Sequence, residues 1–251
     1  MRSGCVLSKQ DLIRYGRQIK YPGFGEEGQE KLKAAHVAVL GVGGLGCAAS
    51  LYLAYAGIGH ITIIDSDSVE LSNLNRQILH WEQDVKERKT TSAARKLASI
   101  NSSIKITPVC DSIAKENIQD MIKEADVVID GLDNFKTRFI VNEACVKQGV
   151  PFVHAGVSGL LGEITTIIPG KTPCLACIYP PFSDGKDVIP VFGVTPALMA
   201  SLQVAEAIKL IAGFGKTLGG RMLYIDSETM EFFIEALAKD PACAVCGAKR
   251  K

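Results

Sequence analysis

The feature that most constrains the fold is a glycine-rich turn between an apolar run and a helical pattern. Residues 36–40 are largely apolar, residues 41–46 read Gly-Val-Gly-Gly-Leu-Gly, and residues 45–56 read as a helix. Glycines at such a turn let a phosphate approach the backbone N–H groups at the positive end of the helix. The candidate nucleotide-binding residues of this turn are Gly41, Gly43, Gly44 and Gly46.

The next strand pattern, residues 61–65, ends in an acidic residue. Asp65 stands at about the distance from the glycines at which a carboxylate accepts hydrogen bonds from ribose hydroxyls. This combination is typical of adenine-nucleotide sites, and it fits an NAD-dependent oxidoreductase as well as an ATP-dependent enzyme.

Strand and helix patterns alternate through most of the remaining chain. Strands are expected at 104–109, 127–130, 152–154 and 164–168, and helices at 90–100, 118–124 and 136–148. Such alternation predicts an α/β fold with a doubly wound, mainly parallel sheet of the Rossmann type.

Further elements are expected at both ends of the chain. Ser8 and Asp11 form a capping box for an N-terminal helix at 8–20. A helix at 196–212 precedes two short strands at 222–225 and 231–236, which we expect to form an antiparallel C-terminal extension. Because no linker divides the chain, we expect a single domain over 1–251, with a nucleotide-binding half at 36–155 and a second half at 156–251.

Composition bears mainly on partners and location. The 251 residues are 47% hydrophobic and carry a net charge of +1, which gives no electrostatic reason to expect a nucleic acid or membrane partner. No uninterrupted apolar run reaches the roughly 18 residues of a membrane span. The first residues lack the apolar run of a signal peptide, so we expect a cytoplasmic protein.

Two Cys-x-x-Cys pairs lie far apart in the sequence. Each pair can chelate one metal, and four thiolates complete a tetrahedral zinc site. Two disulfides, or a redox dithiol beside an unrelated pair, are the alternatives, but a reducing compartment disfavours disulfides. The predicted ligands of this zinc clip are Cys174, Cys177, Cys243 and Cys246.

The segment after Asp65 is rich in hydrogen-bond donors. Arg76 can bind phosphate oxygens through two N–H groups, and Lys89 begins the next helix with a further positive charge. A triphosphate needs such groups and a hydride-transfer site does not, although a solvated loop with an incidental arginine remains an alternative. The other candidate ligands of this segment are Asp67, Asn73 and Gln77.

A third polar cluster, Asp130-Gly131-Leu132-Asp133-Asn134, ends a predicted strand. Ligands of doubly wound sheets gather at the carboxyl ends of strands, so Asp130 and Asp133 are expected near the phosphates, where one of them could hold Mg²⁺. The alternative for Asp133 is a cap on the following helix.

Together these motifs resemble the adenylyltransferases that activate ubiquitin-like sulfur carriers. That family contains the molybdopterin-synthase and thiamine-biosynthesis adenylyltransferases and the catalytic core of ubiquitin-activating enzymes. The resemblance covers essentially the whole chain. Its motifs are Arg14-Tyr15-Gly16-Arg17-Gln18, Gly41 to Gly46, Asp65 with Asp67, Ser72 to Gln77, Lys89, Asp130 to Asn134 with Thr137-Arg138, both cysteine pairs, and Ser201 to Ala207.

The resemblance implies ATP-dependent adenylation of the C-terminal glycine of a carrier protein ending in Gly-Gly, within molybdenum cofactor or thiamine biosynthesis. It implies ATP, Mg²⁺ and structural zinc as cofactors, and a homodimer in which Arg17 reaches the neighbouring subunit's ATP. Asp65 would bind ribose, and Asp133 would serve Mg²⁺ and the adenylation step. The implied phosphate ligands are Asn73, Arg76 and Lys89, beside Gln77 and Asn134.

The chain departs from many relatives at one place. Residues 178–192, between the first cysteine pair and the long helix, contain no cysteine, and Lys186 stands near the position where relatives carry one. A covalent carrier intermediate is therefore not expected there, whereas adenylation does not depend on it. An NAD-dependent oxidoreductase and a catalytically silent scaffold of the same fold remain the alternative functions.

Overall fold

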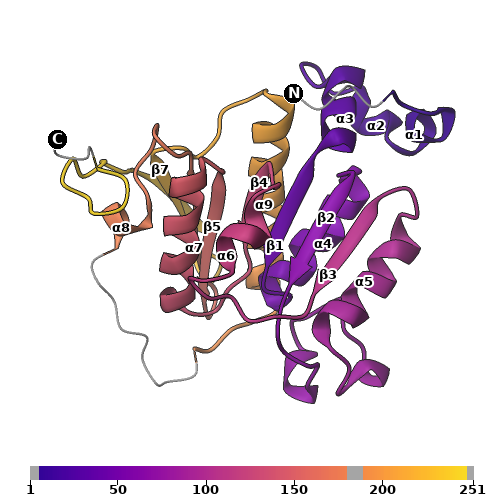
Figure 1. The fold of residues 1–251 in the computed structure, drawn as a ribbon, viewed down its shortest axis with the longest axis horizontal. Helices are drawn as coiled ribbons and strands as arrows, with labels where there is room; N and C mark the ends of the chain where they lie inside the picture. The colour runs from indigo at the N-terminus through magenta and orange to yellow at the C-terminus, as the bar shows by residue number, and fades with distance from the viewer. Residues whose placement is uncertain (1–5, 180–188, 248–251) are drawn as a thin grey trace.

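A single eight-stranded sheet organises the molecule in the computed structural model, which describes residues 6–179 and 189–247 (Figure 1). The strand order is β3-β2-β1-β4-β5-β6-β7-β8, and the first five of these strands are parallel. The parallel strands are β1 (His36–Leu40), β2 (His60–Ile64), β3 (Lys105–Val109), β4 (Val127–Asp130) and β5 (Phe152–Ser158). The predicted doubly wound α/β fold is confirmed, and both predicted halves contribute strands to one sheet.

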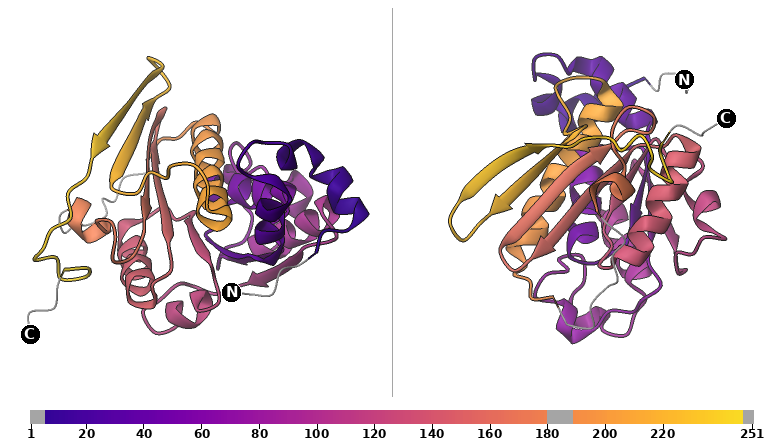
Figure 2. Two further views of the ribbon diagram at one scale, coloured as in Figure 1. Left: turned by 90° about the horizontal axis from the view of Figure 1, so that it is seen from above. Right: turned by 90° about the vertical axis from the view of Figure 1, so that its left-hand side faces the viewer.

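The order of the strands creates a switch point at the centre of the sheet. The chain runs outward from β1 through β2 to β3 and then returns to place β4 on the other side of β1. Connections in the two directions lie on opposite faces, so two helical layers enclose the sheet (Figure 2). One layer contains α4 (Gly44–Ala56), α5 (Lys89–Ile100) and α9 (Val194–Ala212), and the other contains α6 (Ile118–Ile122) and α7 (Phe135–Gln148).

The antiparallel extension is larger than predicted. The strand expected at 164–168 as part of the parallel alternation is β6 (Leu161–Ile167), and it runs antiparallel to β5. Only residues 159–160 separate the two strands, whereas a parallel connection needs a dozen residues or more. The expected hairpin follows as β7 (Arg221–Asp226) and β8 (Glu231–Ala236), so three strands are antiparallel.

The N-terminal segment also differs in detail. The capping box is confirmed: the Ser8 hydroxyl accepts from the Asp11 N–H at 3.1 Å, and the Ser8 N–H donates to the Asp11 carboxylate at 2.8 Å. The single helix expected at 8–20 is interrupted at Tyr15, whose buried hydroxyl accepts a hydrogen bond from Asn101. The resulting helices are α1 (Lys9–Arg14) and α2 (Gly16–Ile19), and the unpredicted α3 (Gly25–Ala34) follows them.

Helix α9 packs in the core of the molecule. Within the described residues it is the one helix long and apolar enough to cross a membrane. It packs against α3, α4 and strands β4, β5 and β6, with Met199, Ala200 and Ala207 fully buried. Its apolar composition is accounted for by these contacts. Cys47 and Cys145 are buried, as their helical patterns predicted.

Candidate functional site

A large pocket opens at the carboxyl ends of the parallel strands. It has a volume of about 930 Å³. Its walls include Gly41 and residues 43–45 after β1, 64–67 at the end of β2, 111–113 after β3 and 131–135 after β4. Ile189, Val191 and Pro196 close it from the side of α9. The pocket thus lies at the topological switch point, where doubly wound sheets bind their ligands.

The glycine-rich turn allows two backbone segments to touch at this point. Gly41 has a φ of +88°, and a Cβ placed on it would lie 2.5 Å from the carbonyl oxygen of Gly131. A Cβ on Gly46 would lie 1.8 Å from the carbonyl oxygen of Gly41. Helix α4 then begins at Gly44 with no side chain capping its first turn. Its positive end is therefore available to an anionic ligand.

Both the N–H and the carbonyl of Val42, the residue between Gly41 and Gly43, form hydrogen bonds with side chains. The Val42 N–H donates to the Asp65 carboxylate at 2.8 Å, and the other oxygen of Asp65 accepts from the Asp67 N–H at 2.8 Å. The Val42 carbonyl lies 3.1 Å from Nε2 of His80 and accepts from the Cys47 thiol at 3.2 Å. Asp65 thus fixes the shape of the turn, a contribution that sequence analysis did not foresee. Its role toward ribose stays a prediction.

Four of the expected phosphate ligands line the pocket, namely Arg76, Gln77, Lys89 and Asn134. Lys89 is buried and forms an ion pair with Asp67 at 2.8 Å, and Arg76 donates to the Ser72 carbonyl at 2.9 Å. Gln77 is buried as well, and its Oε1 has no hydrogen-bond partner among the described residues. A buried oxygen without a partner beside a polar pocket fits a site built for a ligand with donor groups or water.

Two other expected residues lie elsewhere. Asn73 is not among the described pocket residues, and its side chain accepts from the Glu70 N–H at 3.1 Å in the 3₁₀ turn η1 (Leu71–Asn73). Arg17 is exposed on α2 and is likewise not among the pocket residues. The roles that the family resemblance implies for them stay predictions.

Asp130, the last residue of β4, and Asp133, in the loop that follows, have different environments. Asp130 is fully buried, and its carboxylate accepts from Arg138 Nε at 3.0 Å and from the Leu132 N–H at 2.9 Å. Because its oxygens are already bonded inside the protein, Asp130 is the less suitable of the two for Mg²⁺, and its expected position near the phosphates stays a prediction. Asp133 is exposed and lines the pocket, where its carboxylate is available to a cation.

The helix cap after β4 is the next residue rather than Asp133. The side chain of Asn134 accepts from the Thr137 N–H at 2.8 Å at the start of α7. Asn134 also donates to the Asp133 carboxylate at 3.1 Å. Capping by Asn134 leaves Asp133 free to face the pocket, so the capping alternative for Asp133 is wrong.

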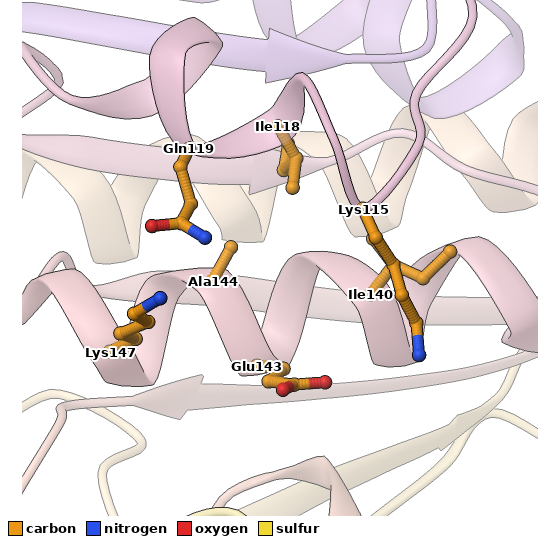
Figure 3. Close-up of a pocket in the computed structure, with 7 residues that line it drawn as sticks. All are labelled: Lys115, Ile118, Gln119, Ile140, Glu143, Ala144 and Lys147. Atoms are coloured by element: carbon orange, nitrogen blue, oxygen red, sulfur yellow. The ribbon is translucent and has the colours of Figure 1, made fainter.

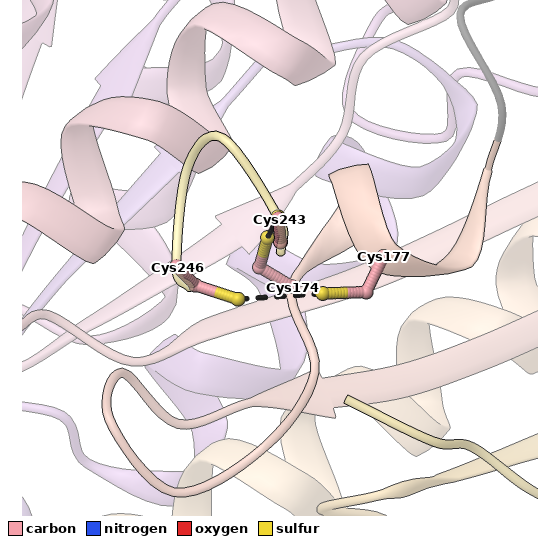
Figure 4. A group of neighbouring side chains, drawn as sticks. All are labelled: Cys174, Cys177, Cys243 and Cys246. Atoms are coloured by element: carbon pink, nitrogen blue, oxygen red, sulfur yellow. Dashed lines mark hydrogen bonds between the residues drawn. The ribbon is translucent and has the colours of Figure 1, made fainter. Parts of the chain in front are cut away.

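The side chains of the four paired cysteines lie close together (Figure 4). Their ligand atoms all lie within 4.8 Å of one another, with sulfur separations of 3.7 Å for Cys174–Cys243 and 3.3 Å for Cys177–Cys246. Four thiolates around zinc stand about 3.8 Å apart, given Zn–S bonds of about 2.3 Å. The cysteines in the described residues are free thiols, so the cluster could hold a metal ion and contains no disulfide.

A second hollow lies between α6 and α7 (Figure 3). It has a volume of about 130 Å³, which is below the roughly 300 Å³ at which small-molecule sites begin. Its charged rim consists of Lys115, Glu143 and Lys147. No sequence motif points to this hollow, and its size excludes a nucleotide.

The chain is similar to curated proteins over nearly its whole length. It is 41% identical over 246 residues to the molybdopterin-synthase adenylyltransferase of Escherichia coli, covering 96% of this chain and 98% of that protein. It is 37% identical over 252 residues to the sulfur carrier protein adenylyltransferase of Thermus thermophilus, covering 96% and 92%. The heterocyst protein HesA of Trichormus variabilis is 40% identical over 243 residues, covering 96% and 91%.

Solved structures agree with this relationship. A crystal structure of Escherichia coli MccB with MccA-N7isoASN superposes with a TM-score of 0.86 at 30% identity, covering 93% of this chain and 75% of that one. MccB solved with ATP gives a TM-score of 0.82 at 29% identity, covering 93% and 73%. The family model described as the ThiF family matches residues 15–245. The chain therefore belongs to the ThiF family.

Proposed function

We propose that this protein is an adenylyltransferase that uses ATP to activate the C-terminal glycine of a ubiquitin-like sulfur-carrier protein. The observation that carries the proposal is the composition of the pocket. A helix N-terminus, three cationic side chains (Arg76, Lys89 and Arg138) and several exposed carboxylates, Asp133 among them, surround a space of about 930 Å³. No histidine or cysteine lines its described walls. Such a site can align and stabilise a nucleotide but offers no evident covalent nucleophile.

Adenylation of a carboxylate needs no nucleophile from the enzyme. A carboxylate oxygen of the carrier attacks the α-phosphorus of ATP, a new O–P bond forms, and the bond to the β-phosphate oxygen breaks to release pyrophosphate. Negative charge develops on the phosphate oxygens, where Arg76 and Lys89 would stabilise it. Preorganised donors of this kind typically contribute about a hundredfold to a thousandfold each in rate.

Asp133 would hold Mg²⁺, which takes one or two carboxylates and completes its shell with phosphate and water. The exposed carboxylate beside the glycine-rich turn fits this chemistry, whereas buried Asp130 does not. When bound, Mg²⁺ neutralises triphosphate charge. In ligand-free form, the Lys89 ammonium is paired with Asp67, so phosphate binding would exchange one anionic partner for another.

The names of the relatives support a protein carrier as the substrate. The chain covers 98% of the molybdopterin-synthase adenylyltransferase and 92% of the sulfur carrier protein adenylyltransferase, but only about three quarters of the MccB chains. These relationships favour a sulfur carrier over the kind of substrate named with MccB. We place the product in molybdenum cofactor or thiamine biosynthesis, and the reaction in the cytoplasm, where free paired thiols persist.

The two other functions are less well supported. An NAD-dependent oxidoreductase would leave Arg76 and Lys89 without a ligand, and two of the similar proteins are named adenylyltransferases. A silent scaffold would not need a polar pocket beside a buried Gln77 oxygen that has no hydrogen-bond partner in the described part of the chain. Lys186, which stands where many relatives carry a cysteine, lies outside the described residues, and the proposed adenylation does not involve it.

The exchange of labelled pyrophosphate into ATP tests the proposed role of Asp133. Asp133→Asn removes the charge and keeps the shape, so we expect exchange in the presence of a Gly-Gly carrier to fall on the order of a hundredfold. Asp120→Asn, a similarly exposed carboxylate on α6, is the matched control and should exchange like the wild type. Wild-type exchange by Asp133→Asn would exclude the proposed role.

A mixed dimer tests the proposed homodimer and Arg17. We propose that each site combines Arg17 of one subunit with Asp133 of the other, so Arg17→Ala and Asp133→Asn proteins should each be nearly inactive. After the two are mixed, half of the dimers are mixed and each has one intact site, so exchange should recover to about one quarter of the wild-type value. A mixture that stays inactive would show that the two residues do not act across a dimer.

We also propose that the four paired cysteines hold one zinc ion per chain. Cys243→Ser should reduce bound zinc from about one per chain to near zero by metal analysis, because three thiolates no longer close the site. Cys110→Ser, which changes an exposed thiol outside the cluster, should keep its zinc. A wild-type protein without zinc would contradict this assignment, and so would a Cys243→Ser protein that keeps its zinc.

A further inference from the structure

A buried chain of charged and polar groups supports the loop that carries Asp133. Two residues, from β4 and α7, hold this loop through the backbone of Leu132. The Leu132 N–H donates to the Asp130 carboxylate at 2.9 Å, and the Leu132 carbonyl accepts from Arg138 at 2.6 Å. Leu132 directly precedes Asp133, so the backbone position of Asp133 depends on the Asp130–Arg138 ion pair.

The register of the sheet places a histidine against this ion pair. Val128 of β4 pairs with Phe152 of β5, and side chains of strands alternate between the faces. Asp130 and His154, each two residues further along, therefore lie on the same face of neighbouring strands. Nδ1 of His154 is 2.6 Å from the Asp130 carboxylate, and the histidine is fully buried.

The other side of His154 faces a second carboxylate. Glu163 of β6 pairs with Gly156, and a Cβ on Gly156 would lie 2.8 Å from the Glu163 carboxylate, so the glycine leaves space for this side chain to reach inward. Nε2 of His154 is 3.3 Å from the Tyr179 hydroxyl and 3.9 Å from Glu163. The Tyr179 hydroxyl itself donates to Glu163 at 2.6 Å.

These contacts are all satisfied when both nitrogens of the histidine carry a proton. The Asp130 carboxylate can only accept, so Nδ1 donates to it. The Tyr179 proton is already directed to Glu163, so Nε2 donates to the tyrosine oxygen. The imidazolium then balances the charges, with two cations, Arg138 and His154, against the two carboxylates.

Burial and neighbours act in opposite directions on this histidine. Burial would lower the pKa of His154, but the hydrogen bonds with Asp130 and Glu163 outweigh burial and raise the pKa. The charges that face it are Asp130 from β4, Arg138 from α7 and Glu163 from β6, with the phenol of Tyr179 between them. Burial would raise the pKa of Asp130, but the charge of Arg138 and the bond from His154 lower it.

We propose that His154, as a buried imidazolium, is a positioning residue for the adenylation reaction, because it holds Asp130 and through Leu132 fixes Asp133. The proposal rests on the proposed function of Asp133. His154 touches no described wall of the pocket, so it acts only through its neighbours. Its loss should therefore slow the chemical step and spare ATP binding, which depends on the glycine-rich turn, Arg76 and Lys89.

The protonation state can be tested without any activity. The chain has four histidines, so side-chain nitrogen NMR signals can be assigned by loss of one signal in His154→Gln. At about pH 7.5, one unit above the ordinary pKa of about 6.5, His154 should still carry both protons. His80 should be neutral, since burial lowers its pKa. A neutral His154 at this pH would overturn the proposal.

Kinetics test the positioning role. His154→Gln should lower kcat for pyrophosphate exchange on the order of tenfold or more, the scale of a small misplacement of a reacting group, and leave KM for ATP nearly unchanged. His36→Gln is the matched control: this buried histidine lies at the amino end of β1, whereas the pocket opens at the carboxyl ends of the strands, so the variant should lose stability without losing kcat. A higher KM with unchanged kcat would contradict the proposal.

A second variant separates charge balance from loss of packing. His154→Gln leaves two carboxylates against Arg138 alone, and adding Glu163→Gln removes the surplus negative charge. The double variant should therefore recover part of the lost kcat. A double variant no better than His154→Gln alone would show that the imidazolium charge is not what matters. Absence of exchange by the wild type with any carrier would refute the proposed function instead, whatever the NMR result.

Discussion

The close contact between the backbones that follow β1 and β4 is the constraint on which the site depends. Gly41, Gly46 and Gly131 meet so tightly that a Cβ on any of them would lie within 2.8 Å of a backbone oxygen. This contact places the first turn of α4 beside the loop that carries Asp133. The positive end of the helix and a carboxylate able to bind a cation thereby face one pocket. A nucleotide triphosphate with its metal ion needs both of these features.

The two backbone segments at this contact are held in a similar way. The backbone of Val42 is bonded at its N–H by Asp65 and at its carbonyl by His80 and Cys47. The backbone of Leu132 is bonded at its N–H by Asp130 and at its carbonyl by Arg138. These side chains thus fix the backbone, while Arg76, Lys89 and Asp133 line the pocket beside it. Rigid support under a polar surface is what preorganised catalysis requires.

The sequence predicted the elements better than it predicted their partners. Glycine spacing and alternating patterns were enough to locate the parallel strands, because these features are local. The antiparallel direction of β6 depends on a connection of two residues, which could have been recognised from the short spacing after β5. The break at Tyr15 could not, since it depends on a contact with Asn101 far along the chain.

In the candidate site, too, local motifs were predicted correctly and long-range contacts were not. The motifs correctly predicted that Lys89, Gln77 and Asp133 line the pocket. Asp130 and Asp133 look alike in the sequence, and their burial distinguishes them in the structure. The sequence contains no local sign that Asp130 pairs with Arg138 and His154, because those residues come from a helix and a neighbouring strand. His80 and His154 were missed for this reason. Their contributions depend on strand register and on packing between layers.

The most direct test of the account is the chemical identity of the activated carrier. A purified carrier ending in Gly-Gly is incubated with the wild-type protein, ATP and Mg²⁺, and its C-terminal peptide is analysed by mass spectrometry, with the free nucleotides measured in parallel. The account predicts an adenylyl group on the terminal glycine, with pyrophosphate as the released product and no modification of a carrier that lacks the last glycine. A phosphorylated carrier with ADP as the product, or an unmodified carrier in the presence of bound ATP, would contradict it.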